Sequence, residues 1–220
     1  MFQDRVDAGT RLAERLRARY AERPGELPSL VLALPRGGVP VGAAVARELG
    51  IGLDVLVIRK VGVPWQPELA LGAVGERGTA VLNEDVAARS GLAAERVAAL
   101  LADGRAAALR LGRDLRGDVG AGAVGSAGFP ALVVDDGVAT GATARAAARV
   151  LRADGAASVV LAVPVCAESV LAELRRDFDD VVAVEVPRRF GSVSQWYRRF
   201  GQVTTDEVRA LLADGRACGG

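Results

Sequence analysis

The chain contains no histidine, and this absence excludes several kinds of chemistry. Ser-His-Asp and Cys-His nucleophile systems, zinc sites with histidine ligands and Cys₂His₂ fingers all need an imidazole. A general base would have to be a carboxylate, an amine, a phenol or the substrate itself. We therefore look for a site built from carboxylates, cations and backbone N–H groups.

Cysteine, excess charge and long apolar runs are also scarce. Cys166 and Cys218 are the only cysteines, too few for a disulfide framework, so we expect both to be reduced. The net charge of +1 provides no overall field that would attract nucleic acid or a membrane surface. No stretch approaches the ~20 apolar residues of a membrane span, and a charged helix begins almost at once. We expect a cytoplasmic protein with neither membrane nor nucleic acid as a partner.

Helices and strands alternate along the 220 residues. Apolar periodicity predicts helices at 4–20, 39–49, 92–115, 144–153 and 168–176. It predicts strands at 30–34, 53–58, 131–134, 158–163 and 181–186, with shorter strands within 73–82. We expect the proline-containing segment 62–71 to be a loop. This order predicts one α/β domain over 1–220 with a central, mainly parallel sheet flanked by helices, a core at about 29–190 and a flexible tail at 215–220.

The stretch 131–143 carries the clearest functional signal. Its apolar run 131–134 predicts a buried strand, so Asp135 and Asp136 would lie at the carboxyl end, where open α/β sheets bind ligands. Backbone N–H groups and hydroxyls in the small-residue turn that follows could bind a phosphate at the start of the next helix. The carboxylates suit ribose hydroxyls and a divalent cation instead. The turn consists of Ala139, Thr140, Gly141, Ala142 and Thr143.

An ordinary strand, polar turn and helix is the alternative interpretation of this stretch. The whole string, however, resembles the fingerprint of the type I phosphoribosyltransferases, which bind phosphoribosyl pyrophosphate (PRPP). The resemblance implies that family's fold, with a small hood beside the sheet, and a 5′-phosphate bound by the turn at 139–143. It also implies Mg²⁺ as cofactor and a catalytic role for Asp135 and Asp136, which would contact the metal directly or through ribose and water.

A second loop follows the first predicted strand and opens a helix. Its two glycines allow a sharp turn that presents N–H groups to an anion, and its arginine adds a planar fork for phosphate oxygens. The alternative is a plain strand-to-helix turn whose arginine faces solvent. In the phosphoribosyltransferases a similar loop binds the pyrophosphate and can contain a cis peptide, which implies a catalytic role for the arginine. The loop consists of Pro35, Arg36, Gly37 and Gly38.

Two cations, Arg59 and Lys60, follow the second predicted strand. They could reach the pyrophosphate, with the segment after them acting as a lid, or they could be an ordinary solvated pair. The family has a flexible catalytic loop at this position, so the resemblance implies that Arg59 and Lys60 belong to it and that Lys60 is catalytic. Trp65 could be a lid residue or a packed surface aromatic.

Two further segments need an interpretation. Gly120, Gly122 and Gly125 match a G-x-G-x-x-G pattern, but they precede a strand instead of following one, so we interpret 117–128 as a linker. The segment 187–200 combines four of the nine aromatic residues with four arginines. It could be a nucleic-acid stacking surface or core packing for the final helix. We favour the family's hood, which receives the acceptor, and we leave the roles of Trp196 and Tyr197 open.

The resemblance covers about residues 29–190, and the longer pattern at 34–39, 59–62 and 67–74 is similar to a bacterial subgroup whose substrates are not assigned. It implies transfer of a phosphoribosyl group from PRPP to a small nitrogen acceptor with release of pyrophosphate. Relatives that act on 6-oxopurines carry an acid where this chain has Ala139, so we do not expect the acceptor to be deprotonated from there. A PRPP sensor and a hydrolase or synthase without a base acceptor remain alternatives. A homodimer remains one of the open oligomeric states.

Overall fold

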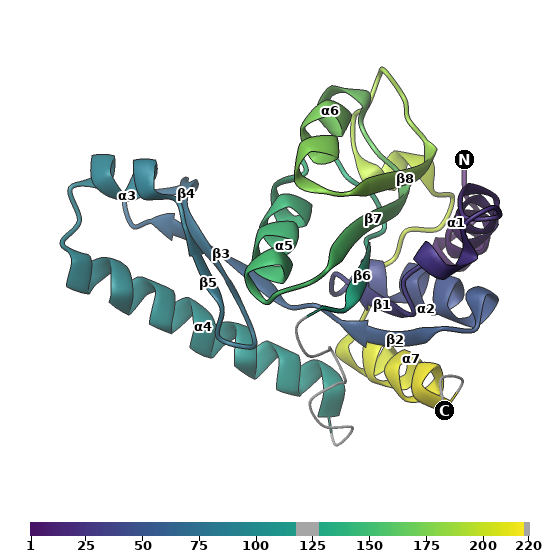
Figure 1. Cartoon of the computed structure of the whole chain (residues 1–220), viewed down its shortest axis with the longest axis horizontal. Helices are drawn as coiled ribbons and strands as arrows, with labels where there is room; N and C mark the ends of the chain where they lie inside the picture. The colour runs from purple at the N-terminus through teal and green to yellow at the C-terminus, as the bar shows by residue number, and fades with distance from the viewer. Residues whose placement is uncertain (118–127, 218–220) are drawn as a thin grey trace.

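The central element is a five-stranded parallel sheet with the strand order β2-β1-β6-β7-β8 (Figure 1). A computed structural model describes residues 1–117 and 128–217 of the chain. The strands are β1 (Leu30–Ala33), β2 (Gly52–Val55), β6 (Pro130–Val134), β7 (Ser158–Val165) and β8 (Asp180–Glu185). Because β1 and β6 are parallel neighbours, the loops that follow them emerge side by side at one edge of the sheet. The expected α/β fold with a parallel sheet is confirmed.

Helices cover both faces of this sheet, because each strand sends alternate side chains to opposite faces. Val31 packs with α1, α2 and α7 on one face, whereas Leu32 packs with α5 and α6 on the other. The parallel strands are buried on both sides, as their continuous apolar runs predict. The helices are α1 (Arg5–Arg19), α2 (Gly38–Leu49), α5 (Ala142–Ala153), α6 (Glu168–Asp177) and α7 (Thr205–Ala217), with short 3₁₀ turns at η1 (Pro24–Glu26) and η3 (Val193–Trp196).

A second sheet extends to one side of the parallel sheet (Figure 1). It is antiparallel, with the order β3 (Ile58–Val63), β4 (Gln66–Gly75) and β5 (Ala80–Leu82). One of its faces packs on α4 (Ala94–Arg116), and α3 (Glu84–Ser90), which we did not predict, joins β5 to α4. The other face meets α5 through a small apolar cluster that contains Ala73 and Val150.

The prediction of a loop at 62–71 is wrong, because most of that segment belongs to the β3–β4 hairpin. Val63 and Leu71 are buried against the α4 side, and this long-range packing outweighs the local effect of the prolines. The register changes from Ala70 opposite Gly62 to Gln66 opposite Val63. Pro67 lies in this irregular stretch, and irregular stretches are where strands tolerate proline. The strand that we expected at 53–58 is also shorter than predicted, because β2 ends at Val55.

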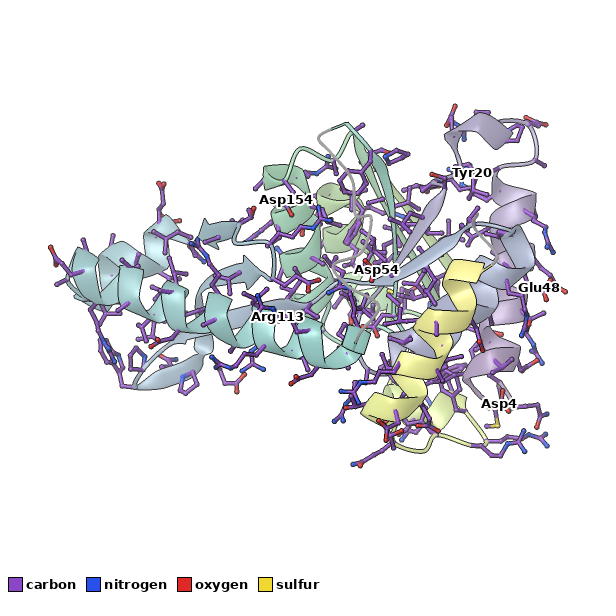
Figure 2. The ribbon with its side chains drawn as sticks, turned by 90° about the horizontal axis from the view of Figure 1, so that it is seen from below. Asp4, Tyr20, Glu48, Asp54, Arg113 and Asp154 are labelled. Carbon is purple, nitrogen blue, oxygen red and sulfur yellow. The ribbon has the colours of Figure 1, made fainter. Side chains whose placement is uncertain are left out.

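A buried ion cluster joins the two sheets. Arg116, at the end of α4, donates to Asp54 of β2 at 2.8 Å and to the two carboxylate oxygens of Glu76 at 2.6 and 2.7 Å. It also donates to the Val55 carbonyl at 2.8 Å. Figure 2 labels Asp54, which lies where the end of α4 meets the parallel sheet. These charge-assisted bonds hold the second sheet and α4 against the domain that carries the site.

Several remaining expectations concern the ends and the cysteines. Residues 215–217 of the expected tail belong to α7, which continues to Ala217. Residues 218–220, with Cys218, and residues 118–127 of the expected linker lie outside the described residues. Cys166 is a buried free thiol, and burial raises its pKa to about 11.

Within 1–117 and 128–217, no helix is long and apolar enough to cross a bilayer.

Candidate functional site

The acidic pair lies at the carboxyl end of β6, as predicted. Asp135 Oδ1 accepts a hydrogen bond from the Asp136 N–H at 2.9 Å, and both residues are half-buried. Burial, and secondarily the charge of Asp136, raises the pKa of Asp135 to about 8. Burial also raises the pKa of Asp136, although the guanidinium of Arg5 opposes that shift. Two carboxylates held this closely favour a cation or hydroxyl donors between them.

The Pro35–Gly38 loop packs directly on this acidic pair. A Cβ added to Gly37 would lie 2.1 Å from Asp136 Oδ2, and one added to Gly38 would lie 2.9 Å from the Cα of Asp135. Only glycine permits this approach, because a side chain at 37 would displace the Asp136 carboxylate and one at 38 would collide with the backbone of Val134 and Asp135. The Pro35–Arg36 peptide is cis, as the resemblance implied, and the Arg36 side chain is exposed beside the loop. The structure therefore brings two of the three predicted site segments together.

The turn at 139–143 leads into α5 on the same chain segment. Gly141 has a left-handed φ of 73°, and a Cβ there would lie 3.3 Å from Leu174 Cδ2. The first turn of α5 has no acidic residue, and no side chain of the described residues caps it. Thr140 and Thr143 are exposed. The N–H groups and hydroxyls at this helix start are therefore accessible to an anion, as predicted.

Arg5 is a site residue that our sequence analysis missed. Its Nε and Nη2 each lie 2.9 Å from Asp136 Oδ2, and the two side chains are only 11% and 14% exposed. Arg5 Nη1 donates to the Gly201 carbonyl at 2.7 Å, and the guanidinium lies 3.9 Å from the centroid of the Phe200 ring. No local pattern could identify this arginine, because it is one of several charged residues on an amphipathic helix.

The aromatic residues of the segment 187–200 mainly pack on one another and on the N-terminus. Tyr197 is buried between Phe2 and Phe200, with ring centroids 5.4 and 5.0 Å apart, and its hydroxyl donates to the Asp136 carbonyl at 2.5 Å. Tyr197 is buried and the other three aromatics of the segment are half-buried, which favours packing over a stacking surface for nucleic acid. Tyr197 and Phe200 therefore have a packing role, but their partners are Phe2 and Arg5 at the N-terminus and not the final helix, and the segment supports the acidic pair.

Arg59 and Lys60 lie in β3, paired with Val74 and Ala73, so the prediction that they belong to a flexible loop is wrong. The strand forms because Val61, the next residue, packs on α4. Side chains alternate along β3, so Arg59 shares the α4 side with Val61, whereas Lys60 faces α5 and lines a cavity with Ala142. Trp65, in the β3–β4 turn, is 65% exposed and is not a packed aromatic.

The acidic pair is also the part of the site that could hold Mg²⁺. Among the described residues, no three His, Cys, Asp or Glu side chains gather at one point, so the protein offers no complete cage. Mg²⁺ usually takes one or two carboxylates and completes its shell with water and substrate oxygens. Asp135 and the free oxygen of Asp136 fit that requirement, because only Oδ2 of Asp136 contacts Arg5.

Comparisons with known proteins agree with this geometry. Residues 3–194 match the family model of the phosphoribosyl transferase domain. Two Mycobacterium tuberculosis proteins, MT0597 and Rv0571c, named provisionally as phosphoribosyl transferases, are each 47% identical over 218 residues. The alignment covers 96% of this chain but only 46% of those relatives, so the chain spans about half of their length.

A solved structure matches over the whole chain. The crystal structure of TT1426 from Thermus thermophilus is 41% identical, covers 100% of both chains and superimposes with a TM-score of 0.82. The family match spans β1, the acidic pair and α5, which together form the site described above. The chain belongs to the phosphoribosyl transferase family.

Proposed function

We propose that this protein transfers the phosphoribosyl group of PRPP to a small nitrogen acceptor and releases pyrophosphate. The observation that carries the proposal is the contact between Gly37 and Asp136, because it sets a pyrophosphate-type loop against a ribose-type acidic pair. The start of α5 supplies a third subsite, for the 5′-phosphate, on the same chain segment. Three subsites in this order match the three polar parts of PRPP.

Each subsite has a chemical role in the proposal. Asp135 and Asp136 accept hydrogen bonds from the ribose hydroxyls, and the N–H groups at 140–143 bind the 5′-phosphate. Arg36 and the N–H groups beside it stabilise the negative charge that develops as the bond from C1 to pyrophosphate breaks. Arg59 and Lys60 have no part in this proposal, because Arg59 lies on the α4 side of β3 and Lys60 lines a cavity that neither Asp135 nor Asp136 reaches.

Mg²⁺ would be held at the acidic pair, where it would neutralise charge on the pyrophosphate and the ribose oxygens. Arg5 then has a supporting role, because it fixes one oxygen of Asp136 and leaves the other to the ligand. The acceptor nitrogen attacks C1 as pyrophosphate departs. No acidic side chain stands at Ala139 to deprotonate it, so we propose an acceptor that is nucleophilic without that assistance.

Pyrophosphate release tests the proposal. The purified protein is mixed with Mg²⁺ and PRPP, alone and with a panel of nucleobases and amines, and released pyrophosphate is measured with an enzyme-coupled assay. Release that depends on one acceptor supports transfer, and release without an acceptor indicates a hydrolase or synthase. Tight binding of PRPP without any release indicates a sensor. A cytoplasmic location is part of the proposal.

A further inference from the structure

A second cationic cavity lies outside the acidic pair and the Pro35–Gly38 loop. It has a volume of about 250 Å³ and is formed between the second sheet and α5. Lys60 of β3 lines one side, and Ala142, Arg145 and Arg149 of α5 line the other. Asn83 adds an amide, and the remaining lining side chains are small or apolar. Neither Asp135 nor Asp136 reaches this space.

The charges in the cavity are not balanced. Arg145 is neutralised by Glu173 at 2.5 Å and Asp177 at 2.6 Å, both from α6. The side chains of Lys60 and Arg149, by contrast, form no ion pair or hydrogen bond with any residue in 1–117 or 128–217. No acidic side chain lines the cavity. Two unpaired cations that line one cavity from different elements repel, and a bound anion would relieve that repulsion.

We propose that this cavity is a second anion site, which binds a compact polyanion such as a pyrophosphate or a sugar bisphosphate and joins β3 to α5. Its volume lies below the range typical of sites for drug-sized ligands, so a compact ligand fits best. Ala142 belongs both to this cavity and to the turn at 139–143, so an anion here would stabilise the start of α5. The site goes beyond the proposed transfer and does not depend on it.

Calorimetry with inorganic pyrophosphate can separate this site from the proposed active site. The starting protein carries Arg36→Ala and Thr140→Val, which disable the two anion loops of the transfer reaction. We expect it to keep one pyrophosphate site. Adding Arg149→Met should weaken that site at least tenfold, because a charge-assisted contact is lost. Adding Arg152→Met is the matched control, since Arg152 lies on the same helix but pairs with Asp179 at 3.1 Å.

Each outcome has one meaning. Pyrophosphate binding that survives the loop substitutions, disappears with Arg149→Met and persists with Arg152→Met establishes the second site, whether or not PRPP is the substrate. Loss of all binding in the loop variant overturns the second site and leaves the proposed function intact. Equal effects of the two arginine substitutions also overturn it, because they would show a general effect of surface charge. Thermal melting of each variant without ligand verifies that it is folded.

Discussion

Arg5 and Asp136 are 131 residues apart in the sequence and form a two-contact ion pair in the fold. Both Nε and Nη2 of the arginine lie 2.9 Å from one carboxylate oxygen. The same guanidinium stacks on Phe200 and donates to the Gly201 carbonyl. The first helix, the acidic pair and the segment after β8 are therefore held together at the candidate site by one side chain.

Substituting Arg5 should destabilise the protein more than substituting an exposed arginine of the same helix. We expect Arg5→Gln to lower the free energy of unfolding by about 1–3 kcal/mol, because it leaves a mostly buried carboxylate without its partner. Arg11→Gln is the control; Arg11 pairs with Asp7 at the surface and lies 5.5 Å from the centroid of the Phe2 ring, so its loss should cost less than about 1 kcal/mol. Urea unfolding measures both, and equal losses would refute a structural role for the Arg5–Asp136 pair.

Removing both carboxylates should weaken binding of the substrate more than it affects the fold. We expect the Asp135→Asn, Asp136→Asn double variant to bind Mg²⁺-PRPP about 2–4 kcal/mol more weakly, since two charge-assisted contacts to the ribose are lost. Isothermal titration calorimetry gives the affinity, and circular dichroism checks the fold. A double variant that binds PRPP like the parent would remove the ribose-binding role.

A methyl group on Gly37 should disrupt the contact between the two loops. The added Cβ would lie 2.1 Å from Asp136 Oδ2, and Arg5 restrains that oxygen, so either the loop or the ion pair must move. We expect Gly37→Ala to reduce PRPP affinity at least tenfold, which corresponds to about 1.4 kcal/mol. Gly25→Ala is the control, because no atom lies within 4 Å of its added Cβ. Unchanged PRPP affinity in Gly37→Ala would argue against the loop as a pyrophosphate site.

The shifted pKa of Asp135 predicts how stability depends on pH without Mg²⁺. The folded pKa of about 8 lies above the ordinary value of 3.8, so the folded protein binds more protons than the unfolded chain between these values. The contribution of Asp135 to stability is therefore largest below pH 4 and falls as the pH rises toward 8. We expect Asp135→Asn to remove this decline and to stabilise the protein at pH 8.5 by on the order of 1–3 kcal/mol.

Thermal unfolding of the parent and Asp135→Asn between pH 5 and pH 9 tests this dependence. Asp85→Asn is a suitable control, since Asp85 lies at the exposed start of α3 and is remote from the acidic pair. If the stability of the parent and Asp135→Asn changes in parallel with pH, Asp135 does not have the raised pKa.

Arg36 should distinguish ligands that carry a pyrophosphate from those that do not. We expect Arg36→Ala to weaken PRPP binding by roughly 1.5–3 kcal/mol and to spare nucleoside monophosphates, because the side chain belongs to the leaving-group loop. Competition binding with both ligands measures the contrast. Equal losses for both would mean that Arg36 supports the fold instead.

Much of the parallel domain could be predicted from the sequence because its signals are local. The apolar run before Asp135 predicts the strand that it forms. The glycines at 37 and 38 predict the turn at which the next helix begins. Strands that alternate with helices predict a parallel sheet, and a parallel sheet collects the loops after its strands at one edge. The acidic pair, the glycine loop and the start of α5 are therefore predictable from short stretches of residues.

Only the tertiary structure decided the features that depend on distant contacts. Pro64 and Pro67 argued locally for a loop, but packing of Val61 and Val63 on α4 made that segment a hairpin and directed Lys60 and Arg59 to opposite faces. The aromatics around Tyr197 became an internal support because Phe2 packs against them from the other end of the chain. Arg5 acquired its role in the same way: a sequence specifies the charge of a side chain, but folding alone brings that charge to a carboxylate 131 residues away.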